Sequence, residues 1–314
     1  MSGEGKSMIT QAEKIIDAHV PVSEKVRVIA VAGATASGKS ALAVEIAKRY
    51  NGEVVSFDSM QIYKDMDIGT AKPTTAEMEG IPHHLIDFAD PKAPFSCAEY
   101  AELAKVTIAE IAGRGKLPVM CGGTGLYLDS VIAVSNVQPS GSNELRRELD
   151  NIAASLTPEE FHDILRECDP ESADKIHPHN VRRVIRALEI FRHTGVTKTE
   201  WDRRSKETPA PYDATVIGIN YTDRQRLYDR IDLRVDIMIE NGLVEEARRL
   251  YESGALDPRG GGIQAIGYKE LIPYLDGAIS LEQAREQIAQ STRNYAKRQI
   301  TWFKAKAYVN WIDV

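Results

Sequence analysis

The segment Gly33–Ser40 is the feature that most constrains the fold. It reads GATASGKS and matches the pattern G-x-x-x-x-G-K-[ST]. The apolar, β-branched run Val26–Ala32 precedes it, and Ser40–Tyr50, which has apolar residues at helical spacing, follows it. A glycine-rich loop between a buried strand and a helix binds phosphate groups, because its backbone N–H groups and the helix N-terminus point at the anion. The sequence therefore predicts a P-loop at the edge of a parallel sheet.

Each residue of this loop is a predicted ligand of a diphosphate or polyphosphate. Lys39 adds a mobile positive charge, and Ser40 is expected to hold Mg²⁺, which prefers oxygen ligands and bound phosphates. Nucleotide hydrolases, kinases and transferases with a diphosphate leaving group all need such a loop, so it does not name the reaction. The predicted diphosphate-binding residues are Gly33, Ala34, Thr35, Ala36, Ser37, Gly38, Lys39 and Ser40.

Further apolar runs alternate with helical patterns along the chain. A helix is expected around Ala98–Ala112. This alternation predicts an α/β fold, with a P-loop NTPase-like parallel sheet core flanked by helices. The other predicted strands are Glu53–Phe57, Leu117–Cys121, Thr215–Asn220 and Tyr308–Ile312.

The pattern changes after Val137. A turn-rich joint, Gln138–Asn143, is followed by roughly 60 residues with helix patterns and almost no strand pattern. We therefore expect a mostly helical inserted domain at residues 138–205, which divides the core into residues 26–137 and 206–314. Residues 1–25 are expected to be a frayed N-terminal extension. Thr222 and Gln225 have capping-box spacing for a long helix that should end at Asn241-Gly242.

Composition excludes several classes of protein. No apolar run approaches the roughly 20 residues that a membrane span needs, and the N-terminal stretch lacks the features of a secretory signal, so a cytoplasmic protein is expected. Cys97, Cys121 and Cys168 form neither an even disulfide framework nor a CxxC pair. The net charge of −7 argues against indiscriminate nucleic-acid binding but not against a local basic face.

Asp58 follows the second predicted strand, at the sheet edge where ligands bind in such folds. It could hold magnesium, or act as a general base that takes a proton from an acceptor, and an Asp that only caps a turn remains the alternative. Ser59, Gln61 and Tyr63 add hydrogen-bonding groups suited to a nucleobase edge. Gly122–Gly125 (GGTG) follows the third strand, so that Thr124 should face the same edge.

Three segments taken together resemble the bacterial transfer RNA dimethylallyltransferases: GATASGKS, then DSMQIYKDMDIGTAKP (Asp58–Pro73), then GGTGLYLDSVI (Gly122–Ile132). The resemblance continues in HHLID, RRVIRALEIF, QAIGYKE and AKRQITWFK, and spans nearly the whole chain from about Val28 onward. It implies that dimethylallyl diphosphate occupies the loop. The exocyclic amine of a flipped adenine, at position 37 beside the anticodon of tRNA, would attack its allylic carbon.

The resemblance also implies roles for single residues. Asp58 would accept the proton of the amine, Lys39 would stabilise the leaving diphosphate, Thr124 would contact substrate, and Arg224 would clamp diphosphate oxygens. The protein is expected to need Mg²⁺ and, because it has no Cys after Cys168, no zinc; a monomer that binds the tRNA anticodon stem-loop is expected. The implied tRNA contacts are Asp58, Ser59, Met60, Gln61, Thr124, Arg146, Arg182, Arg183, Val184, Ile185, Arg186, Gln264, Ala265, Ile266, Gly267, Tyr268 and Lys269.

Three other activities share parts of this pattern. An adenylate isopentenyltransferase would use the same donor on free AMP, ADP or ATP. A P-loop kinase would use Asp58 to activate a hydroxyl, and a nucleotide-dependent switch would need no transferase chemistry. The helical insertion with its arginines favours the RNA acceptor, because a free nucleotide does not require so large a basic surface.

Overall fold

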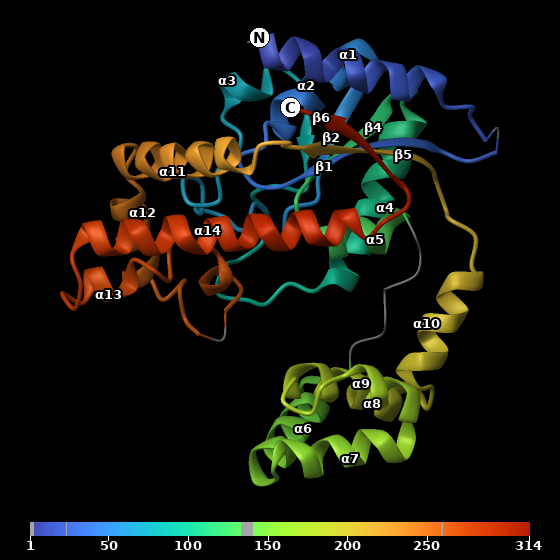
Figure 1. Cartoon of the computed structure of the whole chain (residues 1–314), viewed down its shortest axis with the longest axis vertical. Helices are drawn as coiled ribbons and strands as arrows, with labels where there is room; N and C mark the ends of the chain where they lie inside the picture. The colour runs from blue at the N-terminus through green and yellow to red at the C-terminus, as the bar shows by residue number, and fades with distance from the viewer. Residues whose placement is uncertain (1–2, 23, 133–140, 259) are drawn as a thin grey trace. The chain divides into compact units, whose positions relative to one another are not determined.

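A single parallel sheet organises the core of the chain (Figure 1). The computed structural model describes residues 3–22, 24–132, 141–258 and 260–314. Within these residues the sheet has six strands in the order β3-β2-β4-β1-β5-β6, and every neighbouring pair is parallel. The strands are β1 (Arg27–Gly33), β2 (Gly52–Ser56), β3 (His83–His84), β4 (Leu117–Gly122), β5 (Asp213–Asn220) and β6 (Val309–Asp313). The predicted α/β fold is confirmed.

The strand order places a crevice beside the predicted P-loop. The connection from β1 leads past β4 to β2, whereas the connection from β4 leads to β5 on the other side of β1. Neighbouring strands whose connections leave in opposite directions open a crevice at their carboxyl ends, where ligands bind in such sheets. Apart from its first residue each of these two strands is fully buried, as their continuous apolar sequences predict.

Helices cover both faces of the sheet, and α2 (Lys39–Arg49), α11 (Arg224–Glu240) and α14 (Leu281–Lys304) carry site residues. α2 begins in the P-loop, and α11 packs against α14, which also contacts β1. Figure 1 shows α11 and α14 side by side. Further helices of this part are α1 (Gly3–Ala18), α3 (Thr75–Met78), α4 (Cys97–Gly113), α5 (Gly125–Ile132), α12 (Leu243–Glu252), the 3₁₀ helix η1 (Gly262–Gln264) and α13 (Ile272–Leu275).

The N-terminal residues differ from their expected frayed state. Gly3–Ala18 forms helix α1, whose apolar stripe Met8, Ile9, Ala12 and Ile16 is buried in the main core cluster. α1 contacts α2 and β6, and Gln11 exchanges hydrogen bonds with the backbone of Asp313. The expectation of a frayed extension was wrong, although the sequence contains this amphipathic stripe at helical spacing.

The start of α11 also differs from the expected capping box at Thr222. The N-cap is the next residue, Asp223, whose carboxylate accepts a hydrogen bond from the backbone N–H of Gln225. Ser, Thr and Asp are all good N-caps, so neighbouring candidates compete for the position. The helix ends at Glu240, immediately before the predicted Asn241-Gly242 stop.

Residues 129–211 form a second compact unit, separate from the unit of residues 1–128 and 212–314. It contains helices only among its described residues, and they enclose their own apolar cluster around Leu149, Phe161 and Leu188. The first three residues of the predicted joint Gln138–Asn143 lie outside the described residues. The unit's helices are α6 (Asn143–Ser155), α7 (Pro158–Cys168), α8 (Pro170–Lys175), α9 (Val181–Thr194) and α10 (Lys198–Glu207).

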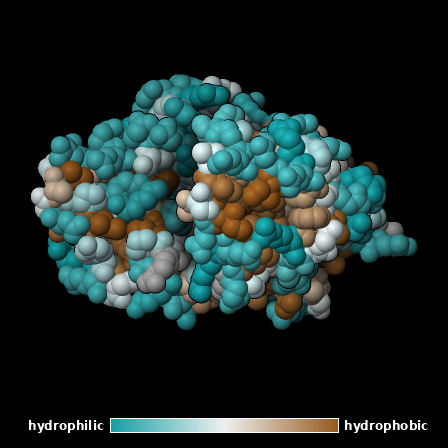
Figure 2. Space-filling model, turned by 90° about the horizontal axis from the view of Figure 1, so that it is seen from below, coloured by the Kyte–Doolittle hydropathy of each residue, from teal (hydrophilic) through white to brown (hydrophobic). Residues whose placement is uncertain are grey.

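Figure 2 shows one face, on which apolar areas lie among hydrophilic residues. Exposed apolar side chains such as Val20 and Leu233 are usual on protein surfaces. Among the described helices, none combines the length and the apolar character that crossing a bilayer requires.

Candidate active site

The P-loop has the backbone of an anion site. Ala36 and Gly38 have positive φ angles of 61° and 88°, and these left-handed residues turn the chain from β1 into α2. Gly33 is needed because a Cβ there would lie 2.8 Å from Oγ of Ser37. The N–H groups of the first turn of α2, from Lys39 onward, have no acceptor within the helix. They therefore remain available to an anion.

Two side chains of the loop fit a phosphate group. The hydroxyl of Ser37 is buried and has no hydrogen-bond partner in the part of the chain that the structure describes. Such an orphaned hydroxyl is unfavourable unless a ligand satisfies it. Within the described residues, the ammonium of Lys39 donates a single long hydrogen bond, of 3.3 Å, to the carbonyl of Ala34. Burial lowers the pKa of Lys39, with Asp58 and Cys121 acting in the opposite direction.

Gln299 of α14 joins the loops that follow β1 and β4. Its Oε1 accepts a hydrogen bond of 2.8 Å from the backbone N–H of Thr35, and its Nε2 donates one of 3.0 Å to the carbonyl of Gly123. The side chain is buried, and a Cβ on Gly123 would lie 2.0 Å from its Nε2. One amide thus spans the crevice between the two strands and fixes the P-loop relative to the GGTG turn.

Asp58 lies at the same edge of the sheet, two residues after β2. Its Oδ1 accepts a hydrogen bond of 2.9 Å from the N–H of Met60, which is the capping role that we considered as an alternative. Its Oδ2 has no partner within the described ranges. Thr124 supports the turn, since its Oγ1 accepts a hydrogen bond of 3.0 Å from the N–H of Ser59. The carboxylate is therefore fixed by one oxygen and free at the other.

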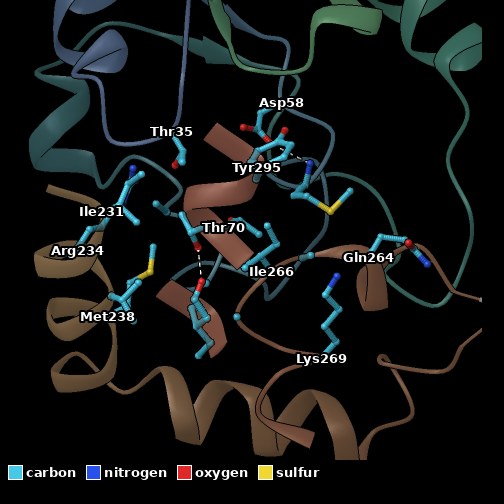
Figure 3. Close-up of a pocket in the computed structure, with 18 of the residues that line it drawn as sticks. Thr35, Asp58, Thr70, Ile231, Arg234, Met238, Gln264, Ile266, Lys269 and Tyr295 are labelled. Atoms are coloured by element: carbon cyan, nitrogen blue, oxygen red, sulfur yellow. Dashed lines mark hydrogen bonds between the residues drawn. The ribbon is translucent and has the colours of Figure 1, made fainter. Parts of the chain in front are cut away.

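A cavity of about 300 Å³ opens at Asp58 (Figure 3). The volume is at the lower end for sites that bind small molecules. Figure 3 shows Thr35, Asp58 and Tyr295 at one end and Lys269 with Gln264 at the other. The sequence-predicted residues that line the cavity are Thr35, Asp58, Ser59, Met60, Gln264, Ala265, Ile266, Gly267 and Lys269.

Several lining residues were not predicted from the sequence. Arg234 of α11 lies on the stripe formed by Ile231, Val235 and Met238, which also line the cavity. An arginine on the apolar stripe of a helix is the signal that could have found it. α14 contributes Ile288, Thr292, Tyr295 and Arg298, and the loop after β2 contributes Gly69, Thr70 and Ala71.

The charges around the cavity are coupled. Burial lowers the pKa of the Arg234 guanidinium, and the nearby carboxylate of Asp58 acts against this. Burial, and after it the charge of Asp58, raises the pKa of Tyr295 to about 12. Arg230, one helical turn before Arg234, donates a hydrogen bond of 2.9 Å to the carbonyl of Ala36 in the P-loop. The site therefore combines a carboxylate, a partly desolvated cation and a neutral phenol.

Other predicted site residues of this unit are not part of the cavity lining, among them Arg224, Tyr268 and Gln61. Arg224 is exposed in the first turn of α11. Tyr268 is fully buried and donates a hydrogen bond of 2.7 Å to Glu246, so the expected RNA contact through its side chain is wrong. Gln61 stands behind the lining and donates hydrogen bonds to the carbonyls of Thr70 and Ala71.

In the helical unit, α9 divides the predicted RNA contacts between two faces. Val184 and Ile185 belong to the unit's core, so their side chains cannot reach RNA and the prediction for them is wrong. Arg182 and Arg183 are exposed, and neither forms an ion pair with a described residue. Arg186 and Arg146 lie 2.8 Å and 3.7 Å from the buried carboxylate of Glu189. Successive residues of a helix point to different faces, so the contiguous predicted range Arg182–Arg186 includes both buried and exposed side chains.

The chain is similar to enzymes that modify tRNA. A model of the family described as IPP transferase matches residues 61–306. Proteins named tRNA dimethylallyltransferase from Caldanaerobacter subterraneus and Halalkalibacterium halodurans are each 50% identical over 291 residues, which cover 92% of this chain and 92% of theirs.

Solved structures agree with this assignment. The crystal structure of a tRNA isopentenylpyrophosphate transferase from Bacillus halodurans is 47% identical, with a TM-score of 0.68 over 92% of this chain and 90% of that one. A eukaryotic dimethylallyltransferase acting on tRNA is 35% identical, with a TM-score of 0.81 over 92% of this chain and 74% of that one. The resemblance predicted from the sequence motifs is thus confirmed, and the chain belongs to the IPP transferase family.

Proposed function

We propose that this protein transfers the dimethylallyl group of dimethylallyl diphosphate to N6 of the adenosine on the 3′ side of the anticodon in tRNA. The observation that carries the proposal is the free oxygen of Asp58 at the end of the cavity where the P-loop opens. The names of the relatives, all at high coverage, support the same reaction.

The reaction forms one bond, breaks another and releases a proton. The exocyclic amine attacks the allylic carbon, a C–N bond forms, the C–O bond to diphosphate breaks, and the amine loses one proton. Asp58 Oδ2, which has no hydrogen-bond partner among the described residues, would accept that proton, because an aromatic amine is a weak nucleophile that benefits from a positioned base. The Asp58 turn, held by Thr124, keeps this oxygen in place during the attack.

The diphosphate belongs on the loop Gly33–Ser40. The orphaned hydroxyl of Ser37, the first N–H groups of α2 and the ammonium of Lys39 would bind its oxygens and stabilise the charge that grows as it leaves. Arg234 is the second cation that we assign to this charge, because it lines the cavity whereas Arg224 does not. An unpaired desolvated cation is unfavourable, so an anionic ligand should bind beside it.

Magnesium fits this loop as a partner of the diphosphate. Among the described residues, no three side chains of His, Cys, Asp or Glu gather to form a cage of protein ligands. Mg²⁺ commonly takes one or two protein oxygens and fills its shell with phosphate oxygens and water, for which the hydroxyl of Ser40 is suited. Bound there, Mg²⁺ would neutralise charge on the leaving diphosphate.

Adenylate isopentenyl transfer is the alternative to test, since it uses the same donor. The experiment supplies labelled dimethylallyl diphosphate and magnesium, with an anticodon stem-loop or AMP as the acceptor. Label on the stem-loop supports the proposal, and label on AMP alone would overturn it. ATP hydrolysis without prenyl transfer would instead favour the kinase or switch class.

A further inference from the structure

Two loops form part of the cavity wall, and neither belongs to a strand of the sheet. Residues 67–71 contribute Gly69, Thr70 and Ala71 to the lining, and residues 264–269 contribute five residues, Tyr268 being the exception. Both segments are turns or short 3₁₀ structure rather than strand or longer helix. Their backbone hydrogen bonds must therefore go to other partners.

Glu246 of α12 is a shared partner of both loops. Its carboxylate is buried at 2% relative exposure. It accepts hydrogen bonds from the successive N–H groups of Asp67 at 3.1 Å, Ile68 at 3.0 Å and Gly69 at 3.1 Å. Successive N–H groups that converge on one anion form a charge-assisted arrangement, which is stronger than bonds between neutral groups.

The second loop reaches the same carboxylate through Tyr268. Its hydroxyl donates a hydrogen bond of 2.7 Å to Oε1 of Glu246. Its ring lies against the backbone of Gly69, where a Cβ would be 2.5 Å from Cζ of the ring. Only glycine permits this approach, so the two loops are packed together as well as bonded to one residue.

The backbone carbonyls of the first loop are bound by a different residue, Gln61. Gln61 Nε2 donates hydrogen bonds of 3.3 Å and 2.9 Å to the carbonyls of Thr70 and Ala71, and Gln61 follows Asp58 by three residues. The loop is thus fixed between the Asp58 turn and Glu246. If residues 67–69, which Glu246 binds, were displaced, the distance between Asp58 and this loop would change.

We infer that Glu246 is a positioning residue for the RNA acceptor, which it never touches, because it fixes two loops of the cavity wall. The inference rests on the proposed function, in which the adenine enters this cavity while the diphosphate binds the loop Gly33–Ser40. Donor binding depends on Lys39 and the Gln299 link, which are in other elements. A substitution at Glu246 should therefore change KM for the RNA acceptor and leave KM for the donor nearly unchanged.

The test compares Glu246→Gln with Glu245→Gln, an exposed neighbour on the same helix. Steady-state KM is measured for an anticodon stem-loop and for dimethylallyl diphosphate, together with Tm. We expect Glu246→Gln to raise KM for the stem-loop about tenfold, because an amide replaces a charged acceptor of several donors, while KM for the donor stays within about twofold. Glu245→Gln should leave both constants unchanged.

Tyr268→Phe keeps the inference falsifiable if Glu246→Gln does not fold. This substitution removes one hydrogen-bond donor to the Glu246 carboxylate and should raise KM for the stem-loop about threefold. A purely structural role would lower Tm and the active fraction with both KM values unchanged, and that result would overturn the inference. If the wild-type protein transfers no label at all, the proposed function fails instead, so the two failures are distinguishable.

Discussion

Gln299 accepts a hydrogen bond from the backbone N–H of Thr35, with 2.8 Å between the nitrogen and Oε1, across 264 residues of sequence. The same side chain donates to Gly123. The P-loop is therefore held in place by the C-terminal helix and not by its own sequence alone. Any ligand on the loop is positioned relative to the residues of α14 that line the cavity.

Replacement of Gln299 by Leu should damage both stability and donor binding. It leaves the buried carbonyl of Gly123 and the part-buried N–H of Thr35 without their partner, which costs about 1 to 3 kcal/mol in the free energy of unfolding. Thermal or urea unfolding measures this cost, and kinetics should show a higher KM for the donor. Gln290→Leu, at an exposed position of the same helix, is the control. Equal stability of the two variants would refute the role of the link.

Arg234 should matter more than Arg224 to the reaction. Arg234→Gln removes a partly desolvated cation from the cavity, and we expect kcat/KM to fall by about two orders of magnitude, the usual scale for a donor that stabilises transition-state charge. Arg224→Gln should cost less, because that side chain is exposed. Arg248→Gln, on the exposed side of α12, controls for charge. A larger loss for Arg224 would support the clamp that the family resemblance implied.

Donor affinity should decline at alkaline pH through Lys39. Burial lowers its pKa from 10.5, so in the free enzyme the cation is lost at a lower pH than in an ordinary lysine. Diphosphate affinity, measured by calorimetry between about pH 7 and pH 10, should fall toward the alkaline end. The effect on folding stability has the opposite sign. Between the lowered pKa of Lys39 in the folded state and its higher pKa in the unfolded state, the unfolded chain binds more protons, so the free energy of unfolding increases as pH rises through this range.

Lys39→Arg is the matched variant for this prediction, since arginine stays charged throughout that range. Its diphosphate affinity should be lower overall but should change less with pH. Because both proteins bind the same diphosphate, ionisation of the ligand changes both affinities equally and does not affect the comparison. An identical pH dependence in the two proteins would rule out Lys39 as the group responsible.

Arg182 and Arg183 should contribute to RNA binding as unpaired surface charges. Removal of either should weaken stem-loop binding and reduce the salt dependence of log Kd by a slope of about one. Filter binding at several salt concentrations measures the slope. Arg166→Gln, at an arginine of the same unit that pairs with Asp174, is the control. An unchanged slope would make the two arginines part of an ordinary solvated helix face.

Local patterns predicted the sheet well. β1 and β4 are continuous apolar runs, so their own residues were sufficient to predict them. The short β3 (His83–His84) was not predicted, because two residues carry no period. The loop 264–269 was predicted through family resemblance, but the burial of Tyr268 depends on Glu246, which is 22 residues away in the chain.

The residues that sequence reasoning missed act over long separations. Arg234 and Tyr295 line the cavity from α11 and α14, and Gln299 of α14 bonds to the loops that follow β1 and β4; no local spacing relates the three to Asp58. Val184 and Ile185 show the converse error, since a contiguous motif was taken as one surface although a helix turns successive residues to different faces. In both cases the missing information is tertiary packing.

Single-turnover transfer to an anticodon stem-loop, by wild type and by Asp58→Asn, tests the central claim most directly. The RNA is digested afterwards to identify the modified nucleoside. We predict N6-isopentenyladenosine at the adenosine 3′ to the anticodon, formed about two to four orders of magnitude more slowly by Asp58→Asn although that variant still binds the donor. Absence of transfer by the wild type, or equal rates for the two proteins, would contradict the account.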